Sequence, residues 1–206
     1  MSLFITFEGG EGSGKSTQAR LLLKRLEHEN VPAVLTHEPG GTGLGGEIRK
    51  LLKRRHGSAI SPWAELFLFA ASRVQLVAEL IRPALEDGYA VICDRFIHST
   101  VAYQAHGRGL DLATVETINK LAIGDLRPDL TILLDLPPEQ GLERRRRLRD
   151  RFEMEELSFH RRVRDGYRAM AAFDPDRWLV IDASLGTTEV ADMIWHRVSS
   201  LLSADC

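Results

Sequence analysis

A stretch near the start of the chain has the residue types and spacing of a phosphate-binding loop. Gly9, Gly14, Lys15 and Ser16 follow the order G-x-x-x-x-G-K-S, directly after the apolar run 3–7. Glycines allow the backbone to wrap closely, so that successive N–H groups and the start of a helix point at phosphate oxygens. Lys15 would reach the β- and γ-phosphates, and Ser16 would ligate Mg²⁺. The pattern favours a nucleoside triphosphate site over the alternative, a glycine turn before an ordinary helix.

Two later apolar runs of strand length end in an aspartate, Asp94 after 91–93 and Asp135 after 132–134. A strand beside the first one delivers its last residue to the loop, so either carboxylate could lie near Mg²⁺. Asp94 is the stronger candidate because Arg95 follows it, and a guanidinium forks well onto a phosphate. The alternative is that Asp94 only caps the next loop and Arg95 lies on the surface. Asp135 is interpreted as a strand-end residue.

A ring and a guanidinium stand four residues apart in a predicted helix. Phe69 and Arg73 would share one face of that helix. An arginine on an apolar helix is costly unless it meets an acceptor. A nucleobase stacked on Phe69, with a carbonyl facing Arg73, would satisfy both residues. The alternative is that Phe69 belongs to the core and Arg73 pairs with an internal carboxylate.

Alternating strands and helices must position these side chains. Apolar runs predict strands at 3–7, 31–36, 89–93, 130–134 and 179–181. Helical spacing is expected at 18–28, 47–53, 61–85, 113–123, 140–150, 153–173 and in a last helix that ends near Leu202, with a glycine-rich loop at 40–46. Residues 66–71 are apolar nearly all round, which predicts burial on most sides of that helix. The pattern indicates an α/β fold, a three-layer doubly wound sandwich with a five-stranded parallel sheet.

Composition bounds the class of protein. With 206 residues, 44% hydrophobic and 27% charged, the chain is long enough to bury the core of a single domain. A net charge of −2 argues against a dedicated nucleic-acid binder. Two cysteines, Cys93 and Cys206, make neither a disulfide framework nor a metal site, so we expect a reducing, cytoplasmic environment. The apolar start meets Glu8 too early for a signal peptide, and no stretch is long enough for a membrane span.

Several other activities lack their motifs. The chain has no HExxH, GxSxG or CxxC, so metal-hydrolase and serine-hydrolase chemistry find no support. A regulatory GTPase would need a guanine-reading NKxD, which is missing. The arginine run 144–147 could bind RNA, but the acidic residues Glu153, Glu155 and Glu156 follow at once. A phosphate loop also occurs in kinases, and whether such a kinase would act on a nucleotide or on a small metabolite stays open at this point.

Five blocks of the chain, in this order, resemble the bacterial thymidylate kinases. They are FEGxEGxGKST from Phe7, EPGGT from Glu38, FxxxR from Phe69, DRF from Asp94 with STxAYQ from Ser99, and DRFE from Asp150. The resemblance covers nearly the whole chain. It implies a nucleoside-monophosphate kinase fold, a homodimer, and transfer of the γ-phosphoryl group of ATP to dTMP with Mg²⁺.

The resemblance also implies roles for single residues. Phe69 would stack on thymine and Arg73 would donate to its O4, while Arg95 would hold the dTMP phosphate and Tyr103 would crowd the 2′ position. Expected catalytic residues are Lys15, Arg95, Arg151 and Glu11, and expected metal-site residues are Ser16, Asp94 and Glu11. ATP is expected at Gly9, Gly10, Glu11, Gly12, Ser13, Gly14, Lys15, Ser16, Thr17 and Arg144. The substrate dTMP is expected at Glu38, Pro39, Phe69, Arg73, Arg95, Ser99, Thr100, Tyr103 and Gln104.

A short arginine-rich lid is expected at about 143–155, inserted into a single kinase domain that spans 1–206. Its arginines are Arg144, Arg145, Arg146, Arg147, Arg149 and Arg151. Arg151 is our choice for the transition-state contact, because the resemblance returns to register at Asp150, with Arg147 or Arg149 as alternatives. A further alternative is that all six are solvated or pair with Glu143, Glu153 and Glu156.

Overall fold

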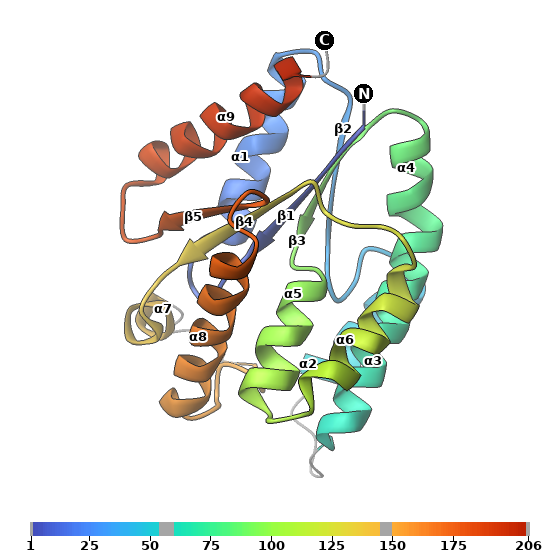
Figure 1. Cartoon of the computed structure of the whole chain (residues 1–206), viewed down its shortest axis with the longest axis vertical. Coiled ribbons are helices and arrows are strands. Elements are labelled where there is room, and N and C mark those ends of the chain that lie inside the picture. Colours follow the sequence, from blue (N-terminus) through green and yellow to red (C-terminus); the bar gives the residue numbers. More distant parts are fainter. Residues whose placement is uncertain (1, 54–59, 145–149, 205–206) are drawn as a thin grey trace.

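A five-stranded, all-parallel sheet runs through the molecule (Figure 1). The computed structural model describes residues 2–53, 60–144 and 150–204. The strands are β1 (Leu3–Glu8), β2 (Ala33–His37), β3 (Ala90–Asp94), β4 (Leu130–Asp135) and β5 (Trp178–Asp182), in the order β2-β3-β1-β4-β5. Every predicted strand is present, and the predicted doubly wound α/β sandwich is confirmed.

Helices cover both faces of the sheet (Figure 1). On one face, α1 (Lys15–His28) and α9 (Thr187–Ala204) pack against alternate residues of β1, Leu3, Ile5 and Phe7. Phe4 points to the other face, where it meets residues near the end of α3 (Pro62–Leu76) and of α6 (Leu112–Ile123). The period-two alternation along β1 therefore separates two hydrophobic layers, as a strand buried on both faces requires.

The structure has several further helical segments. They are α2 (Gly43–Lys53), α4 (Arg82–Glu86), α5 (Ile97–Thr100), α7 (Pro138–Arg144) and α8 (Leu157–Phe173), with two π-helical segments, η1 (Val77–Ile81) and η2 (Val101–Gly107). Of these, α4 leads into the amino end of β3 (Figure 1). The segment η1 continues α3 and η2 continues α5. Among the described residues, no helix combines the length and the apolar character needed to cross a membrane.

Three local predictions were wrong. Part of the expected loop 40–46 is helical, because α2 begins at Gly43 with the side chain of Thr42 accepting a hydrogen bond from the N–H of Gly45 at 3.0 Å. Residues 97–107, which had no predicted structure, are helical. Residues 151–154 form turns, so that α8 begins at Leu157 and not at 153.

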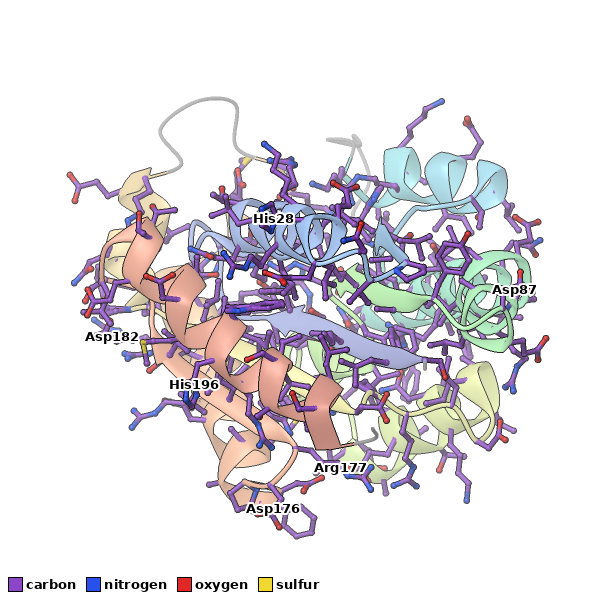
Figure 2. All side chains as sticks on the ribbon, turned by 90° about the horizontal axis from the view of Figure 1, so that it is seen from above. His28, Asp87, Asp176, Arg177, Asp182 and His196 are labelled. Carbon is purple, nitrogen blue, oxygen red and sulfur yellow. The ribbon has the colours of Figure 1, made fainter. Side chains whose placement is uncertain are left out.

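The composition of residues 66–71 predicted that α3 would be buried on most of its sides, and this prediction was wrong. Phe67 is 57% exposed, and Trp63 and Val74 share its outward face at helical spacing. The inward face carries Glu65 and Arg73, which are buried. Figure 2 shows the labelled polar residues Asp87 and Asp176 at the periphery of the molecule.

The order of the strands places the phosphate loop. β1 lies between β3 and β4, so the loop that follows β1 opens where the chain connections diverge to the two halves of the sheet. In open parallel sheets, ligands bind at such a point, outside the carboxyl ends of the strands. The loop, the end of β3 and the segment after it therefore converge on one edge.

Candidate active site

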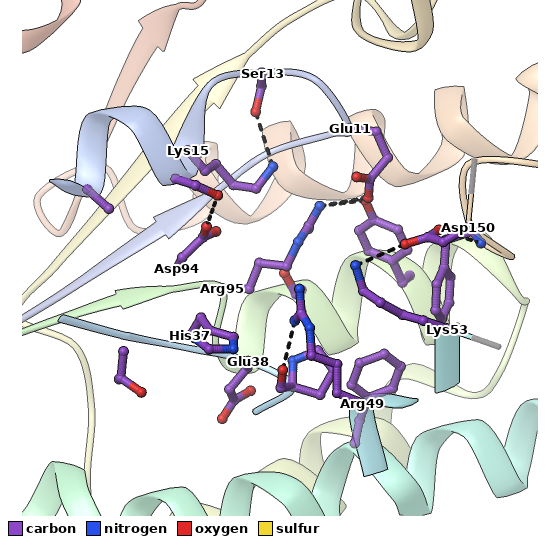
Figure 3. A pocket seen from close by; sticks show the side chains of 18 of the residues that line it. Glu11, Ser13, Lys15, His37, Glu38, Arg49, Lys53, Asp94, Arg95 and Asp150 are labelled. Carbon is purple, nitrogen blue, oxygen red and sulfur yellow. Dashed lines mark hydrogen bonds and ion pairs between the residues drawn. The ribbon is translucent and has the colours of Figure 1, made fainter. Parts of the chain in front are cut away.

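A cavity of about 750 Å³ opens at this edge of the sheet (Figure 3). Most of the residues expected to bind nucleotides line it, although they come from segments far apart in the chain. They are Glu11, Gly12, Ser13, Gly14, Lys15, Ser16, Thr17, Glu38, Pro39, Phe69, Arg73, Asp94, Arg95, Ser99, Thr100, Tyr103, Gln104 and Arg144. Gly9, Gly10 and Arg151 are the expected site residues that do not line it.

The phosphate loop is shaped by glycines. Gly12 has φ +68° and Gly14 φ +93°, a region that side chains rarely adopt. A Cβ on Gly12 would also lie 2.1 Å from the backbone oxygen of Gly141 in α7, and a Cβ on Gly141 would lie 2.1 Å from the oxygen of Glu11. The loop and α7 thus touch backbone to backbone. The part of Gly141 in this contact was missed by the sequence analysis.

Lys15 lies folded against the loop. Its Nζ donates to the carbonyl oxygens of Gly9 at 3.0 Å and Gly10 at 2.7 Å and to the Ser13 hydroxyl at 3.2 Å. Burial lowers the pKa of Lys15 to about 8, with the Arg95 guanidinium acting in the same direction. The expected phosphate-binding cation is therefore held inside the loop by three oxygens.

Ser16 and Asp94 are brought together, as expected of a metal site. The Ser16 hydroxyl donates to the Asp94 carboxylate, and Asp94 pairs with Phe7 across the neighbouring strands β3 and β1. A hydroxyl and a carboxylate are the hard oxygen donors that Mg²⁺ prefers. The part of the chain that the structure describes has no group of three His, Cys, Asp or Glu able to hold a metal ion. A magnesium ion here would complete its shell with phosphate oxygens and water, as Mg²⁺ commonly does.

Asp135, the other strand-end aspartate, is paired with a residue of the helix α8. It accepts from Arg164 of α8 through both carboxylate oxygens, at 2.6 and 2.9 Å. This geometry agrees with its interpretation as a strand-end residue.

Arg95 stands at the centre of the cavity (Figure 3). Its Nη2 donates to the Glu11 carboxylate at 2.7 Å and to the Tyr103 hydroxyl at 3.1 Å, and its Nη1 donates to Ser99 and Tyr167. Arg95 itself has φ +74°, a conformation that non-glycine residues seldom adopt and that clusters at functional sites. Four hydrogen-bonding groups from three segments therefore fix the orientation of one guanidinium.

Two residues behind Arg95 were missed by the sequence analysis. Glu8, at the end of β1, is fully buried and accepts from the N–H of Phe96, the Ser99 hydroxyl and the Tyr167 hydroxyl. Burial raises the pKa of Glu8, although these hydrogen bonds oppose the shift. A glutamate at the end of an apolar strand was a weak signal for this role, and Tyr167 of α8 gave none.

Phe69 and Arg73 line the other end of the cavity. Arg73 is buried, and its Nε donates to both carboxylate oxygens of Glu38 at 3.1 and 2.9 Å, while Nη1 and Nη2 donate to Asn119 and Thr100. Burial raises the pKa of Glu38 to about 7, against the opposing charge of Arg73. Arg73 thus pairs with an internal carboxylate, as the alternative in the sequence analysis stated. Because Arg73 also lines the cavity, its contact with a nucleobase stays a prediction.

The predicted lid lies only partly within the described residues. Arg144 lines the cavity and donates to the backbone oxygen of Ala183 at 3.1 Å. Arg151 instead pairs with Glu65 at 2.6 Å and donates through Nε to the oxygen of Leu52. The predictions for Arg145, Arg146, Arg147 and Arg149 fall outside the described residues.

Two basic residues of α2 join the cavity wall without having been predicted. Arg49 donates to the backbone oxygen of Pro39 at 2.8 Å, and Lys53 pairs with Asp150 at 3.0 Å (Figure 3). Their spacing of four residues on one helix face was the available signal. Together with Lys15 and Arg95 they give the cavity a cationic lining suited to phosphorylated ligands.

Comparison with known proteins agrees with this geometry. Residues 7–194 match the family model described as thymidylate kinase. The chain is 55% identical over 203 residues to a thymidylate kinase of Dehalococcoides mccartyi (strain ATCC BAA-2266 / KCTC 15142 / 195), covering 98% of each chain. It is 51% identical over 205 residues to one of Thermomicrobium roseum (strain ATCC 27502 / DSM 5159 / P-2), covering 98% of this chain and 97% of that one.

The chain is also similar in three dimensions to a solved structure. The crystal structure of thymidylate kinase from Ehrlichia chaffeensis superposes with a TM-score of 0.79 at 37% identity, over 96% of this chain and 98% of that one. A phosphate loop that shares one cavity with Phe69, Arg73 and Arg95 is thus found in a chain whose full length follows one family. The chain belongs to the thymidylate kinase family.

Proposed function

We propose that this cavity is the active site in which the chain phosphorylates dTMP to dTDP, with ATP as the phosphoryl donor. The observation that carries the proposal is the shared cavity: the phosphate loop forms one wall, Phe69 and Gln104 form another, and Arg95 stands between them. ATP would place its phosphates on the loop, and dTMP would place its base against Phe69 and its phosphate at Arg95. The two phosphates would then meet in the middle.

The chemistry needs positioning and charge neutralisation. The second pKa of a phosphate monoester is about 6, so the attacking oxygen of dTMP is already an anion at neutral pH and needs no protein base. Lys15, Arg95 and Arg144 supply positive charge around the transferred group. We propose that Ser16 and Asp94 hold Mg²⁺, which would neutralise charge on the phosphates of ATP. Glu11 is a weaker candidate for that ion, because its carboxylate is paired with Arg95.

Base selection follows from the wall opposite the loop. A thymine stacked on Phe69 would direct a carbonyl at the donors of Arg73, where cytosine would place an amino group. Two donors facing each other leave both unpaired, so dTMP should be preferred strongly over dCMP. Glu38 and Pro39 support this wall, and Tyr103, whose hydroxyl is held by Arg95 and Glu11, would crowd a 2′-hydroxyl group.

We propose that the chain is one domain with a lid at about 143–155, in which Arg151 serves the transition state. In this structure Arg151 is bound to Glu65, so the role requires it to exchange Glu65 for the transferred phosphoryl group. Lids of kinases commonly close on bound nucleotides in this way.

We also propose a homodimer. The apolar stripe formed by Trp63, Phe67 and Val74 on the outward face of α3 supports it, because exposed patches of large apolar side chains mark interaction surfaces. Light scattering should give twice the mass of one chain, and Phe67→Glu should give the mass of one. We propose a cytoplasmic location, since free nucleotides are charged and stay inside cells.

The test is a coupled assay of ADP release over a panel of nucleoside monophosphates. We expect dTMP to have the highest kcat/KM by about 100-fold or more, because an unpaired buried polar group costs up to about 3 kcal/mol. Equal values for dTMP and dCMP would overturn the base pocket, and a better substrate outside the thymine nucleotides would favour a kinase for another nucleotide.

A further inference from the structure

Glu65 of α3 is a fully buried carboxylate that the proposed chemistry does not use. It lies one helical turn before Phe69 on the inward side of α3. Two stretches of the chain supply its partners. Gln104 of η2 donates to it through Nε2 at 2.7 Å, and Arg108, directly after η2, donates through Nε and Nη2 at 3.2 Å. Arg151 forms an ion pair with it, with 2.6 Å between Nη2 and the carboxylate. A single buried acidic group therefore connects the base end of the cavity with Arg151 of the expected lid.

The pairing with Glu65 determines which way the Gln104 amide points. An ionised carboxylate only accepts hydrogen bonds, so the amide nitrogen of Gln104 must face it. The reverse orientation would place the amide oxygen against the carboxylate oxygen. Two guanidinium groups at Glu65, from Arg108 and Arg151, compensate its buried charge and so keep it an acceptor. The carbonyl oxygen is the end of the Gln104 amide that remains for the cavity.

Gln104 is itself 1% exposed and lines the cavity near Phe69. Thymine carries a hydrogen at N3, whereas N3 of cytosine is a bare acceptor. An amide oxygen presented to the base would accept from thymine N3–H and repel cytosine N3. We propose that Glu65 is a positioning residue which, by fixing the polarity of the Gln104 amide, makes the pocket select a pyrimidine protonated at N3. This inference rests on the proposed binding of dTMP in the cavity.

The proposal separates two sources of base discrimination. Arg73 tests the group at position 4 of the base, and the Glu65–Gln104 pair tests position 3. Cytosine would fail both tests. Removing Glu65 should relax only the second, so the preference for thymine should fall without disappearing.

The experiment measures the ratio of kcat/KM for dTMP to that for 5-methyl-dCMP, which keeps the methyl group and changes only the groups at positions 3 and 4. In Glu65→Gln the facing amide both donates and accepts, so Gln104 is free to turn its nitrogen to the base. We expect the ratio to fall by about tenfold, the scale of one hydrogen bond. Glu155→Gln is the matched control, because Glu155 pairs with Arg108 at 2.6 Å, whereas Gln104 donates to Glu65; its ratio should stay at the parent value.

A double-mutant cycle shows whether Glu65 acts through Gln104. Gln104→Ala should lower the ratio, and adding Glu65→Gln to Gln104→Ala should change it no further. A merely structural role for Glu65 would lower the ratio in both backgrounds. That result, or an unchanged ratio in Glu65→Gln alone, would overturn the proposal.

A donor–acceptor swap provides a second variant should Glu65→Gln fail to fold by circular dichroism. In Glu65→Gln with Gln104→Glu, the new carboxylate accepts from the new amide and still offers an oxygen to N3–H. We expect this pair to retain the thymine preference, and its loss would count against the proposal. A parent enzyme without that preference would instead contradict the proposed function itself.

Discussion

Arg95 and Glu11 form an ion pair, with 2.7 Å between Nη2 and Oε1, that joins the residue after β3 to the phosphate loop after β1. Both side chains are largely shielded, at 16% and 13% exposed. A carboxylate at this place holds the guanidinium where an acceptor phosphate would arrive. An incoming phosphate therefore meets a donor that is already aimed, and competes with Glu11 for it.

Arg95→Asn should weaken recognition of the dTMP phosphate. Asparagine tolerates the φ of +74° at this position but lacks the charged fork. We expect kcat/KM for dTMP to fall by about 100-fold or more, the cost of a lost charge-assisted contact. Binding of thymidine, which has no phosphate, should stay within a few-fold of the parent by calorimetry. A parallel loss of thymidine binding would show a damaged base pocket instead.

The pH dependence of ATP use should report Lys15. Its pKa lies near 8 in the free enzyme because burial disfavours the charged form. The ammonium is the form that binds phosphate, so kcat/KM for ATP should fall as pH rises above about 8. Bound phosphates favour the ammonium, so the fall in kcat should begin at higher pH. Identical profiles for the two parameters up to pH 10 would contradict this assignment.

Gly141→Ala should disturb the phosphate loop from outside it. The new Cβ would lie 2.1 Å from the backbone oxygen of Glu11, and a backbone neighbour yields only by moving the loop. We expect kcat/KM for ATP to fall by about 100-fold, the effect of a displacement of about 1 Å. Gly46→Ala in α2 is the control, since a Cβ there has no neighbour within 4 Å; its kinetics should match the parent.

Arg151→Ala distinguishes two roles for this residue. If Arg151 leaves Glu65 to meet the transferred phosphoryl group, kcat should fall by about 1000-fold while the KM for dTMP changes little. If Arg151 acts only through its contact with Glu65, the KM for dTMP should rise while kcat is kept. Steady-state kinetics at saturating ATP give both numbers. The second result would assign the transition-state role to another arginine.

The amino-acid sequence by itself determined the fold class and the nucleotide end of the site. Short apolar runs and helical spacing are local signals, so the five strands were found to within two residues at each end. The loop from Gly9 to Ser16 is a continuous motif whose function depends on its own backbone. Asp94 was brought to Ser16 because parallel strands place their carboxyl ends at one edge. The helical residues 97–107 lacked apolar periodicity and were missed.

Tertiary structure alone decided which charges are partners. Arg73 pairs with Glu38, and Glu65 has its partners at positions 104, 108 and 151; no local pattern links such separated residues. The exposed face of α3 likewise could not be predicted from the sequence, because the composition of a helix does not say which side packs on the core. Buried polar groups need partners, and which partner each one finds depends on the segments that the fold brings within about 3 Å.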